Sequence, residues 1–177
     1  YLLKNNIKTV IHAGDLMDRR KFVNFNILNQ VRERFMEKIH EHGIQFHCIL
    51  GNHDVYYRNT NKVNSLRELF DSDIIVYETP VIKNAAAPIL VGHLELDGYQ
   101  VMRGINHVGG MRPDIFDRYE KVFSGHFHCR QDRGNIYYLG TQYQITFSDL
   151  EEKKGFHILD TDTRDVEFIE NPNRMFH

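Results

Sequence analysis

The chain has 177 residues, of which 41% are hydrophobic and 26% charged, and it carries a formal net charge of -2 at pH 7. A chain of this length can bury a substantial core without disulfides, so we expect one domain over residues 1–177. The near-neutral charge excludes a generally basic surface for nucleic acid or membranes, and no apolar run approaches the ~20 residues that span a bilayer.

Four apolar runs share one pattern along the chain. Each run ends at or near a glycine and is followed by a side chain that can bind a metal ion or move a proton. Short aliphatic or β-branched runs are typical of buried strands, and a glycine lets the backbone turn without a Cβ clash. The four segments are TVIHAGD (9–15), FHCILGNHD (46–54), PILVGH (88–93) and KVFSGHFH (121–128).

Helical patterns lie between these runs. Apolar residues at 28, 31, 35 and 39 predict an amphipathic helix of about five turns that ends at Gly43. SLRE at 65–68 matches a capping box and predicts a shorter helix that begins at Ser65. DIIVYETP (73–80) then predicts a strand that ends at a proline. The order of strands and helices favours an α/β layered fold.

The last third of the chain contains strand signals with little helix between them. They are NIYYLGTQ, GFHILDTDT and DVEFIEN, and their close spacing predicts an antiparallel meander. We therefore expect mixed sheets.

Polar side chains gather at the carboxyl ends of the predicted strands, where ligands usually bind in layered α/β proteins. Carboxylate, imidazole and amide donors without thiolates suit a catalytic Mn²⁺, Zn²⁺ or Fe site. A carboxylate that bridges two such ions is typical of phosphate ester hydrolysis. The candidate residues are Asp15, Asn52, His53, Asp54, His93, His126 and His128.

Each of these short motifs could be structural when taken alone, and their shared context favours a metal site. Other histidines follow different patterns: His12, His47 and His157 alternate with strand neighbours and are expected to be structural. We expect His40, His42 and His177 to be solvated, whereas His107, in a glycine-rich loop, stays open between a structural and a site role.

GDLMD, GNHD, GH and GHFH, in this order, resemble motifs two to five of the calcineurin-like metallophosphoesterases. The longer stretches GDLMDRRK, GNHDVYYRN, YEKVFSGHFH and YYLGTQYQITFSDLEEKKGFHILD are similar to nuclease subunits of double-strand-break repair complexes, of the SbcD type and its phage relatives. The resemblance implies a four-layer αββα sandwich with two mixed sheets. It further implies a DNA exonuclease or endonuclease that uses a dinuclear metal-bound hydroxide, with Mn²⁺ favoured over Mg²⁺, Zn²⁺ or Fe.

The resemblance also implies a role for each candidate. Asp15 would bridge both ions; Asn52, His93 and His126 would complete one, and His128 would bind the other. His53 would stabilise the transition state or protonate the leaving oxygen, held in tautomer and orientation by Asp54, and Asp18 would support the loop. Arg19, Arg20 and Lys21 are weaker candidates for DNA contact, as are Tyr56 and Tyr57 for base stacking, because a charge run is more often solvated and a tyrosine pair more often packs.

The implied partners are DNA, an SbcC-type ATPase and a second copy of the chain, which would dimerise through helices near motifs two and three; no membrane is implied. Cys48 and Cys129 have no CxxC spacing, which favours free thiols and the cytoplasm, or the host cytoplasm for a phage protein.

Two segments depart from the family pattern. The first motif, Asp-x-His, is absent together with its strand, and a strand and helix are absent between Pro80 and Ile89. We hypothesise that residues have been omitted before Tyr1 and near Asn84–Ala87. Two other functions stay open: a phosphomonoesterase or cyclic-nucleotide phosphodiesterase of the same superfamily, and a non-catalytic scaffold.

Overall fold

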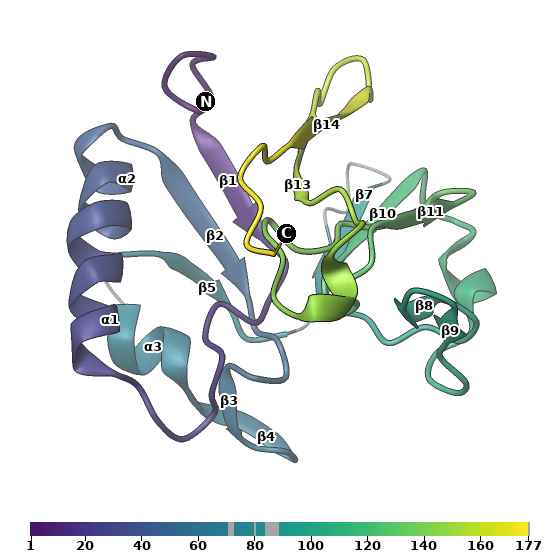
Figure 1. The fold of residues 1–177 in the computed structure, drawn as a ribbon, viewed down its shortest axis with the longest axis horizontal. Helices are drawn as coiled ribbons and strands as arrows, with labels where there is room; N and C mark the ends of the chain where they lie inside the picture. The colour runs from purple at the N-terminus through teal and green to yellow at the C-terminus, as the bar shows by residue number, and fades with distance from the viewer. Residues whose placement is uncertain (71–72, 80, 84–88, 177) are drawn as a thin grey trace. The chain divides into compact units, whose positions relative to one another are not determined.

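The computed structural model describes residues 1–70, 73–79, 81–83 and 89–176, although it does not describe the side chains of 81–83. The chain divides into two compact units, Tyr1–Ile82 (unit 1) and Lys83–His177 (unit 2), which are described separately below (Figure 1). The expectation of one domain over residues 1–177 stays a prediction.

Unit 1 is built on a parallel sheet with the strand order β1-β2-β5. β1 (Thr9–His12) pairs with β2 (Gln45–Ile49), which pairs with β5 (Ile75–Tyr77). His12 is in register with Cys48, so the segments that follow β1 and β2 leave the sheet at the same edge. All three strands were predicted from their apolar runs.

The predicted long helix is present and packs on this sheet (Figure 1). It consists of α1 (Phe25–Val31), a π-helical turn (Arg32–Met36) and α2 (Glu37–Glu41). The π turn adds one residue to the helical repeat, and the buried position therefore moves from Phe35, which is 38% exposed, to Met36. The prediction of Phe35 as a core residue was wrong for this reason.

The helix α3 (Ser65–Phe70) is also present, but its predicted cap was wrong. The Oδ1 atom of Asn64 accepts a hydrogen bond from the amide of Arg67, 3.0 Å away, whereas the buried hydroxyl of Ser65 has no hydrogen-bond partner in the described part of the chain. Asn64 ends a hairpin that the sequence patterns did not predict. Its strands are β3 (Val55–Tyr57) and β4 (Thr60–Asn64).

Unit 2 contains a mixed sheet. β10 (Lys121–Ser124) runs parallel to β7 (Ile89–Gly92) and to β12 (Ile136–Tyr138), and β11 (Gln131–Arg133) is antiparallel to β12. In the strand order β7 is followed by β6 (Val81–Lys83), which contains the boundary of the two units. Mixed sheets were predicted; this sheet is mixed, whereas every described pair in the unit 1 sheet is parallel.

The C-terminal strands differ in part from the predicted meander. β13 (Gly155–Leu159) and β14 (Val166–Glu170) form an antiparallel hairpin as expected, but β12 joins the mixed sheet instead. The remaining elements of unit 2 are β8 (Gln100–Met102), β9 (Ile105–Asn106) and two 3-10 turns, Pro113–Phe116 and Phe147–Asp149. In the described part of the chain, no helix has the length and apolar character needed to cross a membrane.

Candidate functional site

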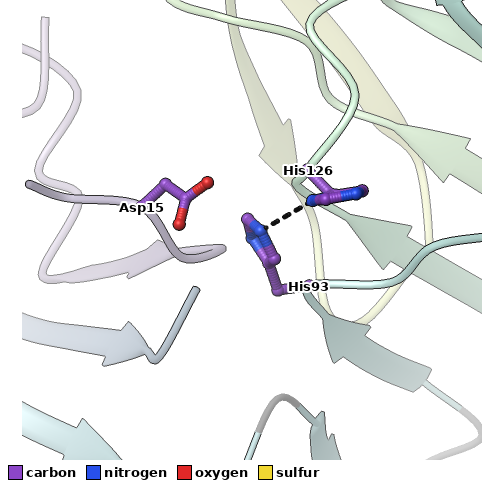
Figure 2. Close-up of side chains that lie close together, drawn as sticks. All are labelled: Asp15, His93 and His126. Carbon is purple, nitrogen blue, oxygen red and sulfur yellow. Dashed lines mark hydrogen bonds between the residues drawn. The ribbon is translucent and has the colours of Figure 1, made fainter. Parts of the chain in front are cut away.

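Asp15 lies in the tight turn after β1 (Figure 2). Its backbone is left-handed, with φ of +57°, directly after Gly14 with φ of +94°. The carboxylate Oδ1 accepts a hydrogen bond from the amide of His53, 2.7 Å away, so the two loops that follow β1 and β2 are joined. Gly51 permits this approach, because a Cβ there would lie 2.1 Å from that Oδ1 atom and 2.3 Å from the Asp15 nitrogen.

The buried carboxylate of Asp54 also holds these two loops together. Its side chain is fully buried and accepts hydrogen bonds from the amides of Asp15 (2.8 Å), Gly51 (2.9 Å) and Met17 (3.0 Å). Burial raises the pKa of this carboxyl group, an effect opposed by the amides of Met17 and Gly51. Asp54 therefore acts as a buried brace for the loops.

His53 is exposed, and its ring is oriented by a backbone group. Its Nδ1 atom lies 2.7 Å from the carbonyl oxygen of Asp18. A carbonyl can only accept a hydrogen bond, so Nδ1 carries the proton and Nε2 is the second ring nitrogen available for proton transfer. The prediction that Asp54 orients the ring was wrong, because the Asp54 carboxylate accepts its hydrogen bonds from backbone amides. The predicted role of Asp18 in supporting the loop stays a prediction, since only its backbone carbonyl contacts the His53 ring.

Asn52 lies in this loop between Gly51 and His53 and is half-buried.

The basic triplet consists of Arg19, Arg20 and Lys21. Arg19 forms an exposed ion pair with Asp18 (3.5 Å), and the Lys21 ammonium lies 5.3 Å from the ring centroid of Tyr56. Arg20 is half-buried.

In unit 2, His93 and His126 face each other (Figure 2). β7 and β10 are parallel, with Gly92 in register with Ser124, so both histidines follow the same sheet edge. Nδ1 of His126 lies 3.1 Å from Nε2 of His93, and the ring planes are inclined by 72°. His126, like Asp15, has a positive φ (+84°), and these two are among four such non-glycine residues in the described part of the chain.

Two buried hydroxyl groups that the motifs did not single out hold the segment after His93. Ser124 Oγ accepts a hydrogen bond from the amide of Leu94 (3.0 Å) and donates one to the carbonyl of Gly125. The Tyr138 hydroxyl donates to the carbonyl of Leu94 (2.9 Å), and burial raises its pKa. The sequence signal that could have identified Ser124 is a polar residue at the carboxyl end of a buried strand.

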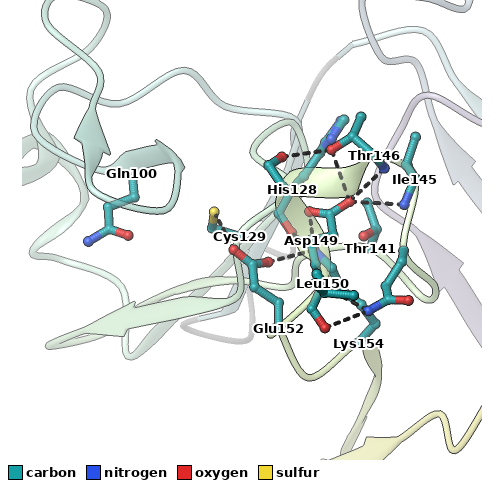
Figure 3. Close-up of polar contacts among 12 residues, drawn as sticks. Gln100, His128, Cys129, Thr141, Ile145, Thr146, Asp149, Leu150, Glu152 and Lys154 are labelled. Atoms are coloured by element: carbon teal, nitrogen blue, oxygen red, sulfur yellow. Dashed lines mark hydrogen bonds and ion pairs between the residues drawn. The ribbon is translucent and has the colours of Figure 1, made fainter. Parts of the chain in front are cut away.

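His128 has an exposed side chain and a firmly held backbone. Its carbonyl accepts a hydrogen bond from Lys154 Nζ, 2.9 Å away (Figure 3). Lys154 is only 4% exposed and pairs with Asp149 (3.0 Å) and Glu152 (2.6 Å). Burial alone would raise the pKa of Asp149, but hydrogen bonds from the amide of Thr146 and from Lys154 outweigh it and lower the pKa. This cluster therefore connects the GHFH loop to the acidic and Lys-Gly segment.

The other described histidines are either packed against neighbouring side chains or exposed to solvent. His47 Nδ1 lies 3.0 Å from the Tyr77 hydroxyl, and His12 lies beside Cys48. Burial lowers the pKa of His47, and it lowers that of His157 to about 4. His107 pairs with Glu95 at 2.9 Å, which favours its structural role. His40 and His42 are exposed as predicted, while His177 and the suspected gap near Asn84–Ala87 lie outside the described residues.

The metal-ligand candidates of each unit carry suitable donor atoms: a carboxylate in Asp15 of unit 1, and two imidazoles in His93 and His126 of unit 2. Carboxylate and imidazole donors without thiolate fit a divalent catalytic ion better than a structural zinc.

Comparison with known proteins identifies two relatives. The chain is 32% identical over 205 residues to exonuclease subunit 1 of Enterobacteria phage T4, an alignment that covers all of this chain and 60% of the relative. It is 25% identical over 129 residues to the SbcD component of the nuclease SbcCD of Staphylococcus saprophyticus, which covers 63% of this chain and 34% of that protein. The chain thus spans less than two thirds of the length of these two relatives.

A solved structure of an archaeal phosphodiesterase matches 96% of this chain and 87% of its own, with 16% identity and a TM-score of 0.48. The family model described as calcineurin-like phosphoesterase matches residues 1–130, which are most of the chain and contain all the metal-ligand candidates. The chain belongs to the calcineurin-like phosphoesterase family.

Proposed function

We propose that this protein is a metal-dependent phosphodiesterase that cleaves DNA as the nuclease subunit of a recombination or repair complex. The observation that carries the proposal is the environment of His53: its Nδ1 proton is engaged by a carbonyl, and its backbone amide binds the carboxylate of Asp15. An imidazole fixed in this way beside a metal-ligand candidate suits proton transfer to a leaving oxygen. The names of two relatives, an exonuclease subunit and a nuclease subunit, support the substrate.

We propose that two divalent ions, with Mn²⁺ favoured, are bound by the residues that the family motifs single out. Asp15 would bind both ions, Asn52, His93 and His126 one of them, and His128 the other. The ions would supply a nucleophile at neutral pH and neutralise charge on the phosphoryl oxygens. The facing nitrogens of His93 and His126 fit this assignment, because imidazole nitrogens bind such ions once they are deprotonated.

The remaining side chains support this chemistry by position. His53, with protons on both ring nitrogens, would donate the Nε2 proton to the leaving oxygen, and the Asp18 carbonyl would hold the Nδ1–H tautomer that remains. Asp54 would keep the loops of Asp15 and His53 in contact, which makes it a positioning residue.

We also propose an SbcC-type ATPase partner and a homodimer. The segment before α1 and the first turn of that helix carry large exposed apolar side chains: Phe22 is 75% exposed, Phe25 81% and Ile27 56%. Exposed apolar side chains in such a group favour association with a second copy. Sedimentation of the protein and of a Phe25→Asp variant would test this, with a dimer expected only for the former. We place the activity in the cytoplasm, which both free cysteines suit.

The nuclease proposal is tested with full-length protein, Mn²⁺ and three substrates: linear duplex DNA, single-stranded DNA and bis(p-nitrophenyl) phosphate. We expect cleavage of DNA, loss of activity by at least about 100-fold in His53→Ala, and unchanged metal stoichiometry in that variant by calorimetry. In Asp15→Ala we expect metal binding itself to be lost. Cleavage of small phosphoesters with intact DNA would favour the phosphomonoesterase or cyclic-nucleotide alternative. If the complex that contains His53→Ala kept its full function, the non-catalytic scaffold alternative would be favoured.

A further inference from the structure

We propose that the β3–β4 hairpin, together with Lys21, binds bases of a single-stranded nucleic acid by stacking, so that the enzyme prefers unpaired or frayed strands. This inference rests on the proposed function and specifies its substrate. The surface, which we call the tyrosine platform, consists of Lys21, Tyr56, Tyr57, Arg58 and Lys62.

The aromatic part of the platform is exposed and preformed. Tyr56 is 38% exposed and Tyr57 51%, and their rings lie edge to face with centroids 4.7 Å apart. Tyr99 and Tyr138, by contrast, are buried, and Tyr138 uses its hydroxyl inside the protein. Exposed aromatic rings offer flat faces to bases at little cost in conformational entropy, and they stack on any base.

The platform is also positively charged. The Lys21 ammonium lies over the Tyr56 ring, and Arg58 and Lys62 are exposed in the hairpin. Residues 55–64 contain no acidic side chain, although the whole chain has a net charge of -2. Nearby, Glu78 is engaged by Arg67 through its carboxylate and by Asn61 through its carbonyl. A local basic patch is what a near-neutral protein needs to hold a phosphate backbone.

The platform is connected to the proton donor by short segments of chain. β3 begins two residues after His53, and Lys21 follows three residues after Asp18, whose carbonyl orients His53. The hairpin is anchored at its base, because the backbone carbonyl of Asp54 accepts a hydrogen bond from the amide of Ser65 (2.8 Å). Within the hairpin, the side chain of the buried Asn64 donates a hydrogen bond to the carbonyl of Asn61 (2.9 Å). A nucleotide stacked here is therefore held on the same rigid loops as His53.

Base stacking predicts a preference for unpaired bases, which attraction between opposite charges alone does not predict. In a duplex the faces of internal bases are covered by their neighbours, so only unpaired bases can reach an aromatic platform. We therefore expect discrimination between oligonucleotides of equal length and charge that differ only in having bases.

The experiment measures binding of full-length protein in EDTA to three labelled ligands by fluorescence anisotropy: oligothymidine, an abasic oligomer of the same length, and a duplex. For Tyr57→Ala we expect affinity for oligothymidine to fall about 5- to 50-fold, with no change for the abasic oligomer. Tyr57→Phe should bind like the parent protein. Tyr143→Ala removes a tyrosine of similar exposure (50%) from unit 2 and is the matched control, expected to have no effect. Lys21→Ala should weaken all three ligands and reduce their salt dependence.

Unchanged oligothymidine binding by Tyr57→Ala, or equal losses for the base-containing and abasic oligomers, would overturn the proposal. Hydrolysis of bis(p-nitrophenyl) phosphate with Mn²⁺ separates this failure from that of the proposed function. If the parent protein and Tyr57→Ala both hydrolyse it, only the platform is wrong. If the parent protein hydrolyses neither that substrate nor DNA, the proposed function fails.

Discussion

The His53 ring is fixed by the backbone of Asp18, since its Nδ1 atom lies 2.7 Å from that carbonyl oxygen. The Asp18 carboxylate points elsewhere: it pairs with Arg19 and is 90% exposed. Every residue type has a carbonyl, so the tautomer of His53 depends on the path of the loop and is independent of the side chain at position 18.

Asp18→Ala should therefore retain nearly full activity, with unfolding stability within about 0.5 kcal/mol of the parent protein. Asp54→Ala should be inactive and less stable by roughly 3 kcal/mol or more, because it leaves the buried amides of Asp15, Gly51 and Met17 without an acceptor. Urea unfolding and DNA cleavage measure the two effects. Equal loss of activity in both variants would mean that Asp18 acts through its carboxylate.

Gly51→Ala should abolish metal binding. The added methyl group would overlap the carboxylate and amide of Asp15 and force that loop to move. Gly43→Ala is the control: position 43 has φ of +61°, and a methyl group added there would have no atom within 4 Å, so this variant should lose about 1–2 kcal/mol of stability and keep its metal. Calorimetric titration with Mn²⁺ distinguishes them. Normal metal affinity in Gly51→Ala would contradict the assignment of Asp15.

Lys154→Met should destabilise the protein by about 3–5 kcal/mol, because it leaves the acidic groups of Asp149 and Glu152 without their buried partner. It also frees the carbonyl of His128, so Mn²⁺ stoichiometry should fall. The neighbouring Lys153→Met removes only an exposed pair with Glu170 and should cost under about 1 kcal/mol. Thermal unfolding measures stability; a similar shift in both variants would argue against the buried cluster as a brace.

Stability should fall as the solution becomes acidic between pH 6.5 and about 4, partly because of His157. Burial lowers its pKa in the folded protein to about 4, an effect increased by Arg130 and opposed by Asp132. In this range the unfolded chain binds a proton that the folded chain does not. The contribution of neutral His157 to the free energy of unfolding is therefore complete above about pH 6.5 and is lost progressively as the pH falls to about 4. Partial exposure of the ring limits the effect to roughly 1–2 kcal/mol. His157→Gln should show a shallower decline in urea unfolding at pH 7, 5.5 and 4.5; an identical slope would exclude His157 as the cause.

The strands that carry the candidate residues were predictable, because a buried strand and the glycine after it leave a pattern in a few neighbouring residues. The role of Asp54 was not, since its three partners are backbone amides, which carry no sequence signal, and two of them lie on a loop some 40 positions away. The wrong prediction of Phe35 as a core residue has a similar origin. A π turn depends on packing and cannot be detected from apolar residues that recur every 3.6 positions. The Asn64 cap was missed because a capping-box pattern one residue later matched equally well.

The left-handed backbone at Asp15 and His126 limits how this site can be altered. Asparagine, aspartate and histidine adopt that conformation far more readily than most residues, while β-branched and longer side chains resist it. A substitution meant to change the metal preference at these two positions must therefore first be compatible with a left-handed backbone, whatever donor atom it offers. Asp15→Asn can keep the turn and alter only charge, whereas Asp15→Glu or His126→Cys would also disturb the path of the chain.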